Sequence, residues 1–501
     1  MHTIIHGDCL EELKKLDDNS VDAVITDPPY GLSNTKPQQV ADVLKAWVTG
    51  DTVSVPAKRG GFMGKDWDSF VPPPAVWAEC MRVLKPGGHM AVFAGARTQD
   101  LMGLSIRLAG FEIRDTLGWI YGSGFPKSHD IGKAIDKRGG NAHLAKEIGK
   151  AIQEARESRG LTKGWCDERF CGGTTNWSWF EGRPAGIRPP SIEAFKDIVS
   201  EWPELGVYAE KVAEVEREVV GRAKGAQAES TGRYGAWGND RGDGISEYNL
   251  TAPATSEAQR WDGWGTALKP AIEPIILARK PLDGTVANNV LAHGVGGLNI
   301  DACRVGSDGG TAAVNFGETR GAMYGGGKGK PTNEVSDIGK GRFPANVLLD
   351  EHAAKEMDEQ SGVSVSKAGG RSGTHFSAGN EGVPTPDRPR GGHTDSGGAS
   401  RYFPVFKYQA KAPKKERPVI EREDGSKIQH PTVKPLALLE WLVELITPEG
   451  GLILDPFAGT GTTLQAATNK GFHSIGIEAD TDYVQLIHKR LEGGTTSTRS
   501  S

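Results

Sequence analysis

Four consecutive residues, Asp27-Pro28-Pro29-Tyr30, combine groups that suit an exocyclic amine. They follow a short apolar run, residues 21–26, which predicts a strand. Neither proline has an N–H, and each keeps the residue before it out of the helical region, so we expect a stiff, extended segment. The Asp27 carboxylate and the Pro28 carbonyl would be neighbouring acceptors for the two hydrogens of an –NH2 group, and Tyr30 offers a flat face for a base. The alternative is an ordinary proline-rich turn.

A glycine-rich turn near the end of the chain predicts a nucleoside site. The turn, residues 455–463 (DPFAGTGTT), lies between a predicted strand and a predicted helix, where glycines let a ligand approach the backbone. Glu478 ends the next predicted strand, a position from which a carboxylate can accept both ribose hydroxyls. A phosphate-binding loop requires a lysine where Thr462 stands, and a dinucleotide loop requires a glycine where Leu464 stands. The sequence therefore predicts a nucleoside ligand without phosphates.

Together these segments resemble the amino-methylating DNA methyltransferases, which use S-adenosylmethionine to modify N6 of adenine or N4 of cytosine. Residues 6–9 (HGDC) resemble the family's cofactor-adenine segment, and residues 430–435 (HPTVKP) resemble the segment before the helix that borders the cofactor pocket. The catalytic motif precedes the cofactor loop, as in the permuted group called β. The resemblance implies catalytic roles for Asp27, Pro28, Pro29 and Tyr30. It implies S-adenosylmethionine contacts from Asp8, Cys9, Thr432, Lys434, Asp455, Phe457, Gly459, Gly461, Thr462 and Glu478.

The activity that the resemblance implies is site-specific methylation of N6 of adenine in double-stranded DNA, by direct transfer to a flipped base. Asp before Pro-Pro-Tyr is commoner in the family's adenine enzymes and Ser in its cytosine-N4 enzymes, so N4 methylation is the alternative. Enzymes that act on a protein glutamine or on RNA usually show Asn there and place the cofactor motif first. A cytosine-C5 enzyme would need a cysteine after a proline, which the chain lacks. A DNA-binding regulator with an inactive core is a further alternative, which the intact Asp27, Gly459, Gly461 and Glu478 disfavour.

Strands that alternate with helices at both ends of the chain predict a doubly wound, Rossmann-like α/β sheet of parallel strands. In such a sheet, ligands bind where neighbouring strands send their helices to opposite faces. If the strand ending at Asp27 pairs with the strand ending at Asp455, both motifs open into one crevice. Residues 34–70 are expected to form a loop excursion, and Thr98 is expected to cap a helix that reaches Ala109.

Composition changes along the chain predict a core that is split by a long middle region, partly helical and partly disordered. Gly, Ser and Pro dominate residues 305–340 and 360–400, which favours mobile loops there. The predicted segments are the catalytic half of the core at 1–130, a helical insertion at 131–264, a core-adjacent segment at 265–300, a target-recognition region at 301–418, the cofactor half at 419–492 and a disordered tail at 493–501.

The middle region offers two candidate DNA-binding segments. Residues 143–205 resemble repressor-type helix-turn-helix domains, with Trp177 and Trp179 as core residues of an ordinary insertion in the alternative. Residues 401–418 interleave basic and aromatic side chains, which suits phosphate contact and stacking, with a charged edge strand as the alternative. The candidate DNA contacts are Thr174, Thr175, Asn176, Ser178, Arg401, Lys407 and Lys411. We expect sequence readout mainly from 300–418, with 143–205 as an accessory module.

The overall composition limits the protein's class and location. A net charge of −5 over 501 residues excludes a basic packaging protein, so DNA contact requires local patches. We find no apolar run approaching the roughly 18 residues of a membrane span, and the start lacks the regions of a signal peptide. Five scattered cysteines predict neither a disulfide framework nor a zinc site. We therefore expect a cytoplasmic protein without a metal or a membrane partner, and the resemblance leaves a homodimer and a separate restriction endonuclease open.

Overall fold

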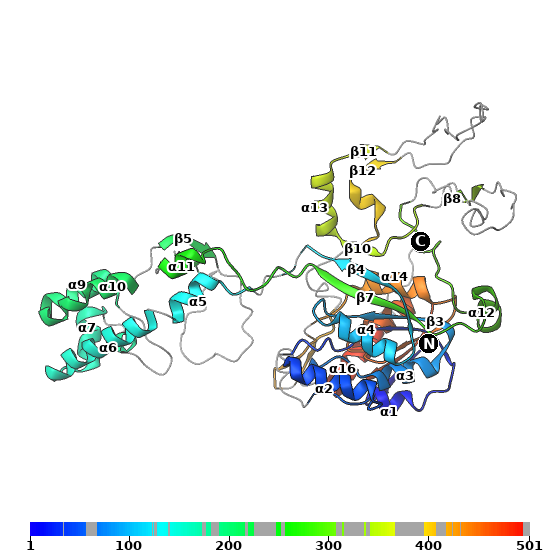
Figure 1. Ribbon diagram of the computed structural model, residues 1–501, viewed down its shortest axis with the longest axis horizontal. Helices are drawn as coiled ribbons and strands as arrows, with labels where there is room; N and C mark the ends of the chain where they lie inside the picture. Colours follow the sequence, from blue (N-terminus) through cyan, green and yellow to red (C-terminus); the bar gives the residue numbers. More distant parts are fainter. Residues whose placement is uncertain are drawn as a thin grey trace. The chain divides into compact units, whose positions relative to one another are not determined.

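Two compact units make up the chain, Met1–Gly124 with Ala271–Ser501, and Phe125–Pro270. The computed structural model (Figure 1) describes residues 1–33, 35–56, 68–122, 124, 128–138, 141–172, 177–181, 190–215, 219–224, 247–251, 256–306, 313–314, 335–336, 341–365, 395–406, 417–422, 424–430 and 432–493.

The first unit is built on a nine-stranded sheet in the order β1-β17-β16-β2-β3-β7-β4-β10-β13. Its strands are β1 (His2–His6), β17 (His473–Glu478), β16 (Leu452–Asp455), β2 (Val21–Thr26), β3 (Leu84–Phe93), β7 (Ile272–Arg279), β4 (Glu112–Ile120), β10 (Val347–Asp350) and β13 (Val405–Phe406). The C-terminal strands β17 and β16 therefore lie between the N-terminal strands β1 and β2. The predicted Rossmann-like α/β fold is confirmed.

One strand departs from the all-parallel sheet that the sequence predicts. β7 runs antiparallel to both β3 and β4, whereas the other pairings in this sheet are parallel. The reason is where the chain leaves and rejoins the sheet. β4 ends at Ile120, and β7 begins at Ile272 directly opposite it, so the returning strand runs back along β4 (Figure 1).

Both faces of the sheet are covered, as expected for a doubly wound fold. On β3, Met90 and Val92 belong to the core beneath α3 (Pro74–Val83) and α4 (Gln99–Leu108). The alternating residues Ala91 and Phe93 belong to the opposite core, beneath α14 (Leu436–Ile446) and α15 (Thr462–Asn469). The period-2 alternation of a strand thus divides the apolar side chains between two helical layers.

One local prediction was wrong. Part of the expected excursion at 34–70 is a helix, α2 (Pro37–Val48), with proline at its first position and Val43 and Trp47 buried. Thr98 occupies the N-cap position of α4 and Ala109 its C-cap position, as predicted, although the Thr98 side chain makes no capping bond. β3 begins at Leu84, and a register shift between Val21 and Ala23 of β2 accommodates the additional residues of β3.

The remaining described elements of the first unit are shorter or lie at its margins. They are α1 (Cys9–Leu13), α12 (Val286–His293), α13 (Glu351–Ser361), α16 (Thr481–Gly493), the 3-10 helix η4 (Ala399–Tyr402), and the strand pairs β8 (Ala313–Val314) with β9 (Val335–Ser336), β11 (Ser364–Val365) with β12 (Ser396–Gly397), and β14 (Ile420–Glu421) with β15 (Lys427–Ile428).

The second unit is mainly helical. Its elements are α5 (Ile131–Arg138), α6 (Asn141–Ser158), α7 (Lys163–Phe170), α8 (Trp177–Glu181), α9 (Ile192–Glu201), the 3-10 helix η3 (Pro203–Tyr208), α10 (Ala209–Val215), α11 (Ser256–Arg260) and the pair β5 (Val219–Lys224) with β6 (Glu247–Thr251). Trp177 and Trp202 lie at the centre of its core with their rings 5.5 Å apart, and Phe170 stacks on Trp177. Trp177 is thus a core residue, as the alternative to the helix-turn-helix interpretation holds.

A buried carboxylate joins three helices of the second unit. The Glu181 side chain is only 1% exposed and accepts hydrogen bonds from the Arg156 guanidinium and from Trp177 Nε1. Lys163 Nζ lies 3.1 Å from its other oxygen. A buried charge is tolerated only when it is paired and hydrogen-bonded in this way, so α6, α7 and α8 depend on one another through Glu181.

We predict that Glu181→Ala destabilises the second unit by about 3–5 kcal/mol, because Arg156 would be left as a buried charge without its partner. Hydrogen exchange followed by mass spectrometry should show faster exchange in α6 through α10 and unchanged exchange in the sheet of the first unit. Glu157→Ala is the matched control, because Glu157 also contacts Arg156 but is 55% exposed and should contribute about 1 kcal/mol or less. Equal protection in the two variants would contradict the assignment.

Candidate active site

The two motifs meet at the carboxyl edge of the sheet. β16 and β2 pair in parallel, with Ile453 opposite Ala23 and Leu454 opposite Val24, which confirms the predicted pairing. Beyond the last paired residues, Thr26 Oγ1 donates to Asp455 Oδ1 at 2.7 Å. α3 and α15 lie in the separate cores on opposite faces of the sheet, so these two strand ends mark the point where ligands bind in doubly wound sheets.

A hydrogen bond from the backbone to the Glu478 carboxylate fixes the glycine turn. Glu478 Oε2 accepts from Gly459 N at 2.8 Å, and its Oε1 accepts from Asp480 N at 2.8 Å. Gly459 and Gly461 both have positive φ, +55° and +75°, which favours glycine. A Cβ on Gly461 would lie 2.8 Å from the Ile487 side chain, whereas a Cβ on Gly459 would meet nothing within 3.8 Å. The backbone at Gly459 can therefore take a ligand at close range.

Glu478 also has the acceptor capacity that a ribose requires. Each carboxylate oxygen makes one backbone hydrogen bond and keeps a second lone pair. Burial raises the pKa of Glu478 to about 7, with Asp480 and Asp455 adding to the shift against the lowering effect of the two backbone bonds. The residues present thus fit a nucleoside with two free hydroxyls.

The neighbouring strand end places the predicted adenine segment beside Glu478. β1 pairs in parallel with β17, His6 lies opposite Glu478, and Gly7 N donates to Glu478 O at 3.0 Å. Asp8 caps α1 by accepting from Leu10 N at 3.0 Å. Burial, followed by the charge of Asp8, raises the pKa of Cys9 to about 12, so this thiol stays protonated and forms a neutral wall.

The other predicted cofactor residues support the turn. Asp455 Oδ1 accepts from Phe457 N at 3.1 Å, and burial raises the pKa of Asp455 to about 6. The Phe457 ring packs against Trp77 at 6.3 Å between ring centroids. Thr462 begins α15 and is buried, whereas Thr432 N donates to His430 Nδ1 at 3.2 Å, ahead of α14.

The Asp27–Tyr30 loop is held by two residues that the sequence reasoning missed. The Asp68 carboxylate accepts from Tyr30 N at 2.8 Å and from Gly31 N at 2.9 Å, and Thr98 Oγ1 donates to Tyr30 O at 2.6 Å. Pro28 and Pro29 donate nothing to the backbone, so these contacts at the end of the motif fix the loop. Asp68 lies in the expected loop excursion, where its type alone gave no signal of this contact.

Four polar side chains form a cluster around the Asp27 carboxylate, which we call the Lys434 cluster: Asp27, Tyr30, Glu273 and Lys434. Lys434 Nζ lies 2.9 Å from Asp27 Oδ2 and 3.0 Å from both Glu273 Oε1 and Tyr30 Oη. The Tyr30 hydroxyl lies 2.7 Å from Asp27 Oδ1 and 2.6 Å from Glu273 Oε1. Glu273 comes from the antiparallel strand β7 and was missed by the sequence reasoning, because a lone glutamate in an apolar strand has no motif.

This geometry argues against the predicted cofactor role of Lys434. An ammonium has three donors, and here the three acceptors are Asp27, Tyr30 and Glu273. The side chain is only 12% exposed. Burial alone would lower the pKa of Lys434, but the adjacent carboxylates of Asp27 and Glu273 outweigh it and raise that pKa above its usual value. Lys434 therefore stays charged and holds the Asp27 carboxylate in place.

Burial likewise raises the pKa of the Tyr30 hydroxyl, with Asp27 and Glu273 adding to the shift, so Tyr30 stays protonated. Its hydroxyl is used within the cluster, while Lys434 Nζ lies 5.2 Å from the centre of its ring. The cluster carries two carboxylates and one ammonium and is therefore negative overall, which suits an amine donor.

Of the predicted DNA-binding residues, only Arg401 and Ser178 lie within the described part of the chain. Arg401 is used internally: its guanidinium donates to Gly397 O, Gly398 O and Tyr402 Oη, and its side chain is 12% exposed, which argues against a phosphate contact. Ser178 lies on α8, half-buried. Thr174, Thr175, Asn176, Lys407 and Lys411 lie outside the described residues.

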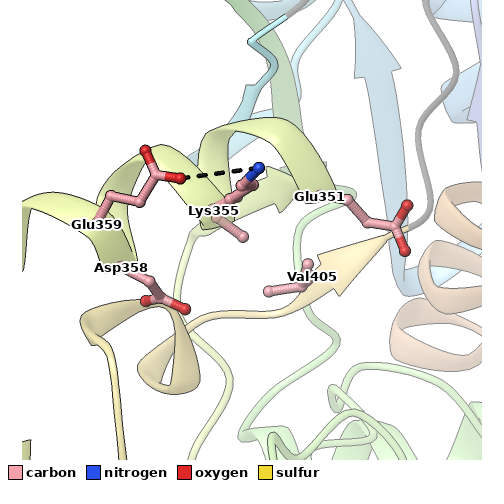
Figure 2. Close-up of a pocket in the computed structure, with 6 residues that line it drawn as sticks. Glu351, Lys355, Asp358, Glu359 and Val405 are labelled. Atoms are coloured by element: carbon pink, nitrogen blue, oxygen red, sulfur yellow. Dashed lines mark ion pairs between the residues drawn. The ribbon is translucent and has the colours of Figure 1, made fainter. Parts of the chain in front are cut away.

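Figure 2 shows a surface hollow on α13 and β13 that does not belong to this site. It is lined by Glu351, Asp358 and Glu359 together with Lys355, whose Nζ lies 3.8 Å from Glu359. Asp358 also accepts from Ser400 N at 2.8 Å, which ties α13 to η4. Three carboxylates against one ammonium make the hollow unsuitable for DNA phosphates.

The described residues contain neither a membrane-spanning helix nor a group of metal ligands. In this part of the chain no helix is both long and apolar enough to cross a bilayer. Across the same residues, no three His, Cys, Asp or Glu side chains are grouped so that they could hold a metal ion.

A family described as DNA methylase, the N6/N4 methyltransferases, matches residues 21–142 and 351–489, just over half of the chain. Type II methyltransferase M2.DpnII of Streptococcus pneumoniae is 48% identical over 64 residues, which cover 13% of this chain and 24% of that protein. Type II methyltransferase M.ScaI of Streptomyces caespitosus is 38% identical over 77 residues, 15% of this chain and 25% of that protein. The chain thus spans about a quarter of the length of the curated relatives it matches.

Two solved structures are similar at low scores. The PvuII DNA methyltransferase, described as cytosine-N4-specific, is 12% identical with a TM-score of 0.36, covering 99% of this chain and 90% of that one. A DNA modification methylase of Thermus thermophilus, complexed with S-adenosyl-L-methionine, is 14% identical with a TM-score of 0.32, covering 99% and 98%.

The pKa of Glu478 gives a pH prediction for nucleoside binding. Accepting two ribose hydroxyls requires the ionised carboxylate, so affinity should rise with pH through the value of about 7 and weaken by up to about tenfold per pH unit below it. The probe is 5′-methylthioadenosine, which has no group that titrates near pH 7, and the measurement is calorimetry across this range. Glu478→Gln should bind more weakly and lose the pH dependence. A wild-type affinity that is flat with pH would show that the ribose is held elsewhere.

Proposed function

Because the chain belongs to the N6/N4 methyltransferase family of DNA methylases, we propose that it transfers a methyl group from S-adenosylmethionine to the exocyclic N6 amine of adenine in double-stranded DNA. The observation that carries this proposal is the parallel pairing of β2 with β16. It brings an amine-accepting loop and a nucleoside cradle to neighbouring strand ends, so that methyl donor and acceptor can meet.

The assignment to adenine rests on Asp27, since Asp before Pro-Pro-Tyr is commoner in the family's adenine enzymes. N4 of cytosine is the alternative, because it presents the same –NH2 group and the PvuII enzyme is cytosine-N4-specific. The Type II names of the relatives support a restriction–modification setting. A homodimer and a separate restriction endonuclease stay predictions from the resemblance.

We assign the cofactor to the cradle at the ends of β1, β17 and β16. Glu478 would accept the ribose hydroxyls, the backbone at Gly459 would approach the ligand, and Asp8 and Cys9 would border the adenine. When bound, S-adenosylmethionine supplies an electrophilic methyl group on its sulfonium. We do not include Lys434 among the cofactor-binding residues, because its ammonium contacts the Asp27 carboxylate.

The chain's own residues prepare the amine for attack. The exocyclic nitrogen is a poor nucleophile because its lone pair is delocalised into the ring. The Asp27 carboxylate and the Pro28 carbonyl would accept its two N–H groups and favour a pyramidal nitrogen with a localised lone pair. Both Asp27 oxygens keep a free lone pair beside their contacts with Tyr30 and Lys434, which hold the carboxylate still. The base cannot reach this loop inside a duplex and must be flipped out.

The test of the proposed function is to express the protein in a host that lacks DNA methylation and to sequence the host DNA for modified bases. N6-methyladenine at a defined sequence is the expected result. N4-methylcytosine would support the alternative target, and the absence of any modified base would contradict the proposal.

Asp27→Ala should lower the rate of methyl transfer at least about 10²-fold, because the amine loses its charged acceptor. The affinity for S-adenosylmethionine should change little, since Asp27 contacts Tyr30 and Lys434 rather than the glycine turn. Single-turnover transfer of a labelled methyl group and calorimetry measure the two quantities. Asp42→Ala is the control, because Asp42 is exposed on α2, where its carboxylate accepts a hydrogen bond from Gln38. Full activity in Asp27→Ala would overturn the catalytic assignment.

A further inference from the structure

One hydroxyl in the Lys434 cluster stands between two carboxylates. Tyr30 Oη lies 2.7 Å from Asp27 Oδ1 and 2.6 Å from Glu273 Oε1, both hydrogen-bond distances. A phenol has a single proton and can donate to only one of them. The second contact becomes a hydrogen bond only when one carboxyl is protonated. The three side chains Asp27, Tyr30 and Glu273 therefore need one additional proton before both contacts can be hydrogen bonds.

The charged groups around these three side chains allow them to accept an additional proton. Glu273 sits opposite Trp119 of β4, and the charged or titratable groups of the described residues that contact its carboxylate are Tyr30 and Lys434. Its side chain is only 19% exposed. With Asp27 included, two carboxylates face one ammonium, so an added proton neutralises the net negative charge of the cluster.

The proposed reaction produces such a proton. Attack of a neutral amine on a sulfonium methyl leaves the positive charge on the nitrogen, which must then lose a hydrogen. Resting on the proposed function, we propose that Glu273 is the terminal acceptor of this proton, which reaches it from Asp27 through the Tyr30 hydroxyl.

The N–CH3 bond forms as the S–CH3 bond breaks, which leaves a neutral thioether and a cationic nitrogen. That nitrogen gives its proton to Asp27 Oδ1. Asp27 Oδ1 passes a proton to Tyr30 Oη while the former Tyr30 proton moves to Glu273 Oε1. The products are the neutral N-methylated amine of the base, ionised Asp27, neutral Tyr30 and protonated Glu273, which then releases its proton to water.

Lys434 cannot serve as the acceptor in place of Glu273. An ammonium has no acceptor site, and its three donors already point to Asp27, Tyr30 and Glu273. Its role in the relay is to hold the three oxygens at hydrogen-bond distance. Glu273 acts through Tyr30, whose hydroxyl its carboxylate contacts.

The first test compares Glu273→Gln and Tyr30→Phe with wild type, using genomic DNA from a methylation-deficient host and methyl-labelled S-adenosylmethionine in single-turnover reactions. Both variants keep the shape of the side chain but interrupt the relay. We expect a loss of about 10²-fold in rate, the size of a general-base contribution, with unchanged cofactor affinity, and a pH profile in which the remaining rate rises with hydroxide. Glu444→Gln is the matched control, because it removes another Glu–Lys pair, 3.1 Å from Lys470, outside the site.

Chemical rescue separates proton acceptance from positioning. Small carboxylates should restore the rate of Glu273→Ala, and formate and acetate should differ in the order of their basicity. Rescue that follows ligand size alone, or no rescue in a variant that still binds cofactor, would overturn the relay.

A readout without turnover uses infrared spectroscopy of the protein alone. Subtraction of the Glu273→Gln spectrum from the wild-type spectrum isolates the carboxyl band of Glu273, which should shift in the Tyr30→Phe background because the Tyr30 hydroxyl contacts Glu273 Oε1. A Glu273 band that is unchanged by Tyr30→Phe would contradict the proposal. If wild type transfers no label to DNA, the proposed function fails and the relay with it. If wild type transfers label and Glu273→Gln is as fast, only the relay fails.

Discussion

The parallel pairing of β2 with β16 is the constraint on which the rest of the site depends. It joins residues more than 400 positions apart in sequence, and the Thr26–Asp455 hydrogen bond at 2.7 Å extends the contact beyond the strands. Because side chains after parallel strands emerge at one edge, the Asp27–Tyr30 loop and the glycine turn become neighbours. The order of the two motifs along the chain is therefore irrelevant to the chemistry, and the long middle region can be inserted without disturbing the crevice.

A second feature, the Lys434 cluster, explains how the Asp27 carboxylate can be held in position in a largely buried site. The ammonium contacts both carboxylates and the hydroxyl between them, so no oxygen is left as an isolated buried charge. One partner, Glu273, arrives on β7, the strand that returns from the second unit and runs antiparallel. The reversal of this strand thus helps to complete the set of contacts around the Asp27–Tyr30 loop.

The sequence was informative where residue types alone determine local geometry. The prolines after Asp27, the glycines at 459 and 461, and Glu478 at a strand end predicted the two motifs and their pairing. The sequence was uninformative where a long-range contact determines the role of a residue. Lys434 resembled a cofactor residue but contacts Asp27, and Glu273 and Asp68 act through tertiary contacts that no local pattern encodes. Arg401 looked like a phosphate contact because composition cannot show that its guanidinium is used internally.

The most direct test of the account is a crystal structure of the protein with S-adenosylhomocysteine. The account predicts the ribose hydroxyls on Glu478, the adenosine beside Asp8 and Cys9, and the sulfur facing the Asp27 loop across β16 and β2, with Lys434 still on Asp27 rather than on the ligand. A ligand bound away from Glu478, or one whose sulfur faces away from Asp27, would contradict the claim that the two motifs form one active site.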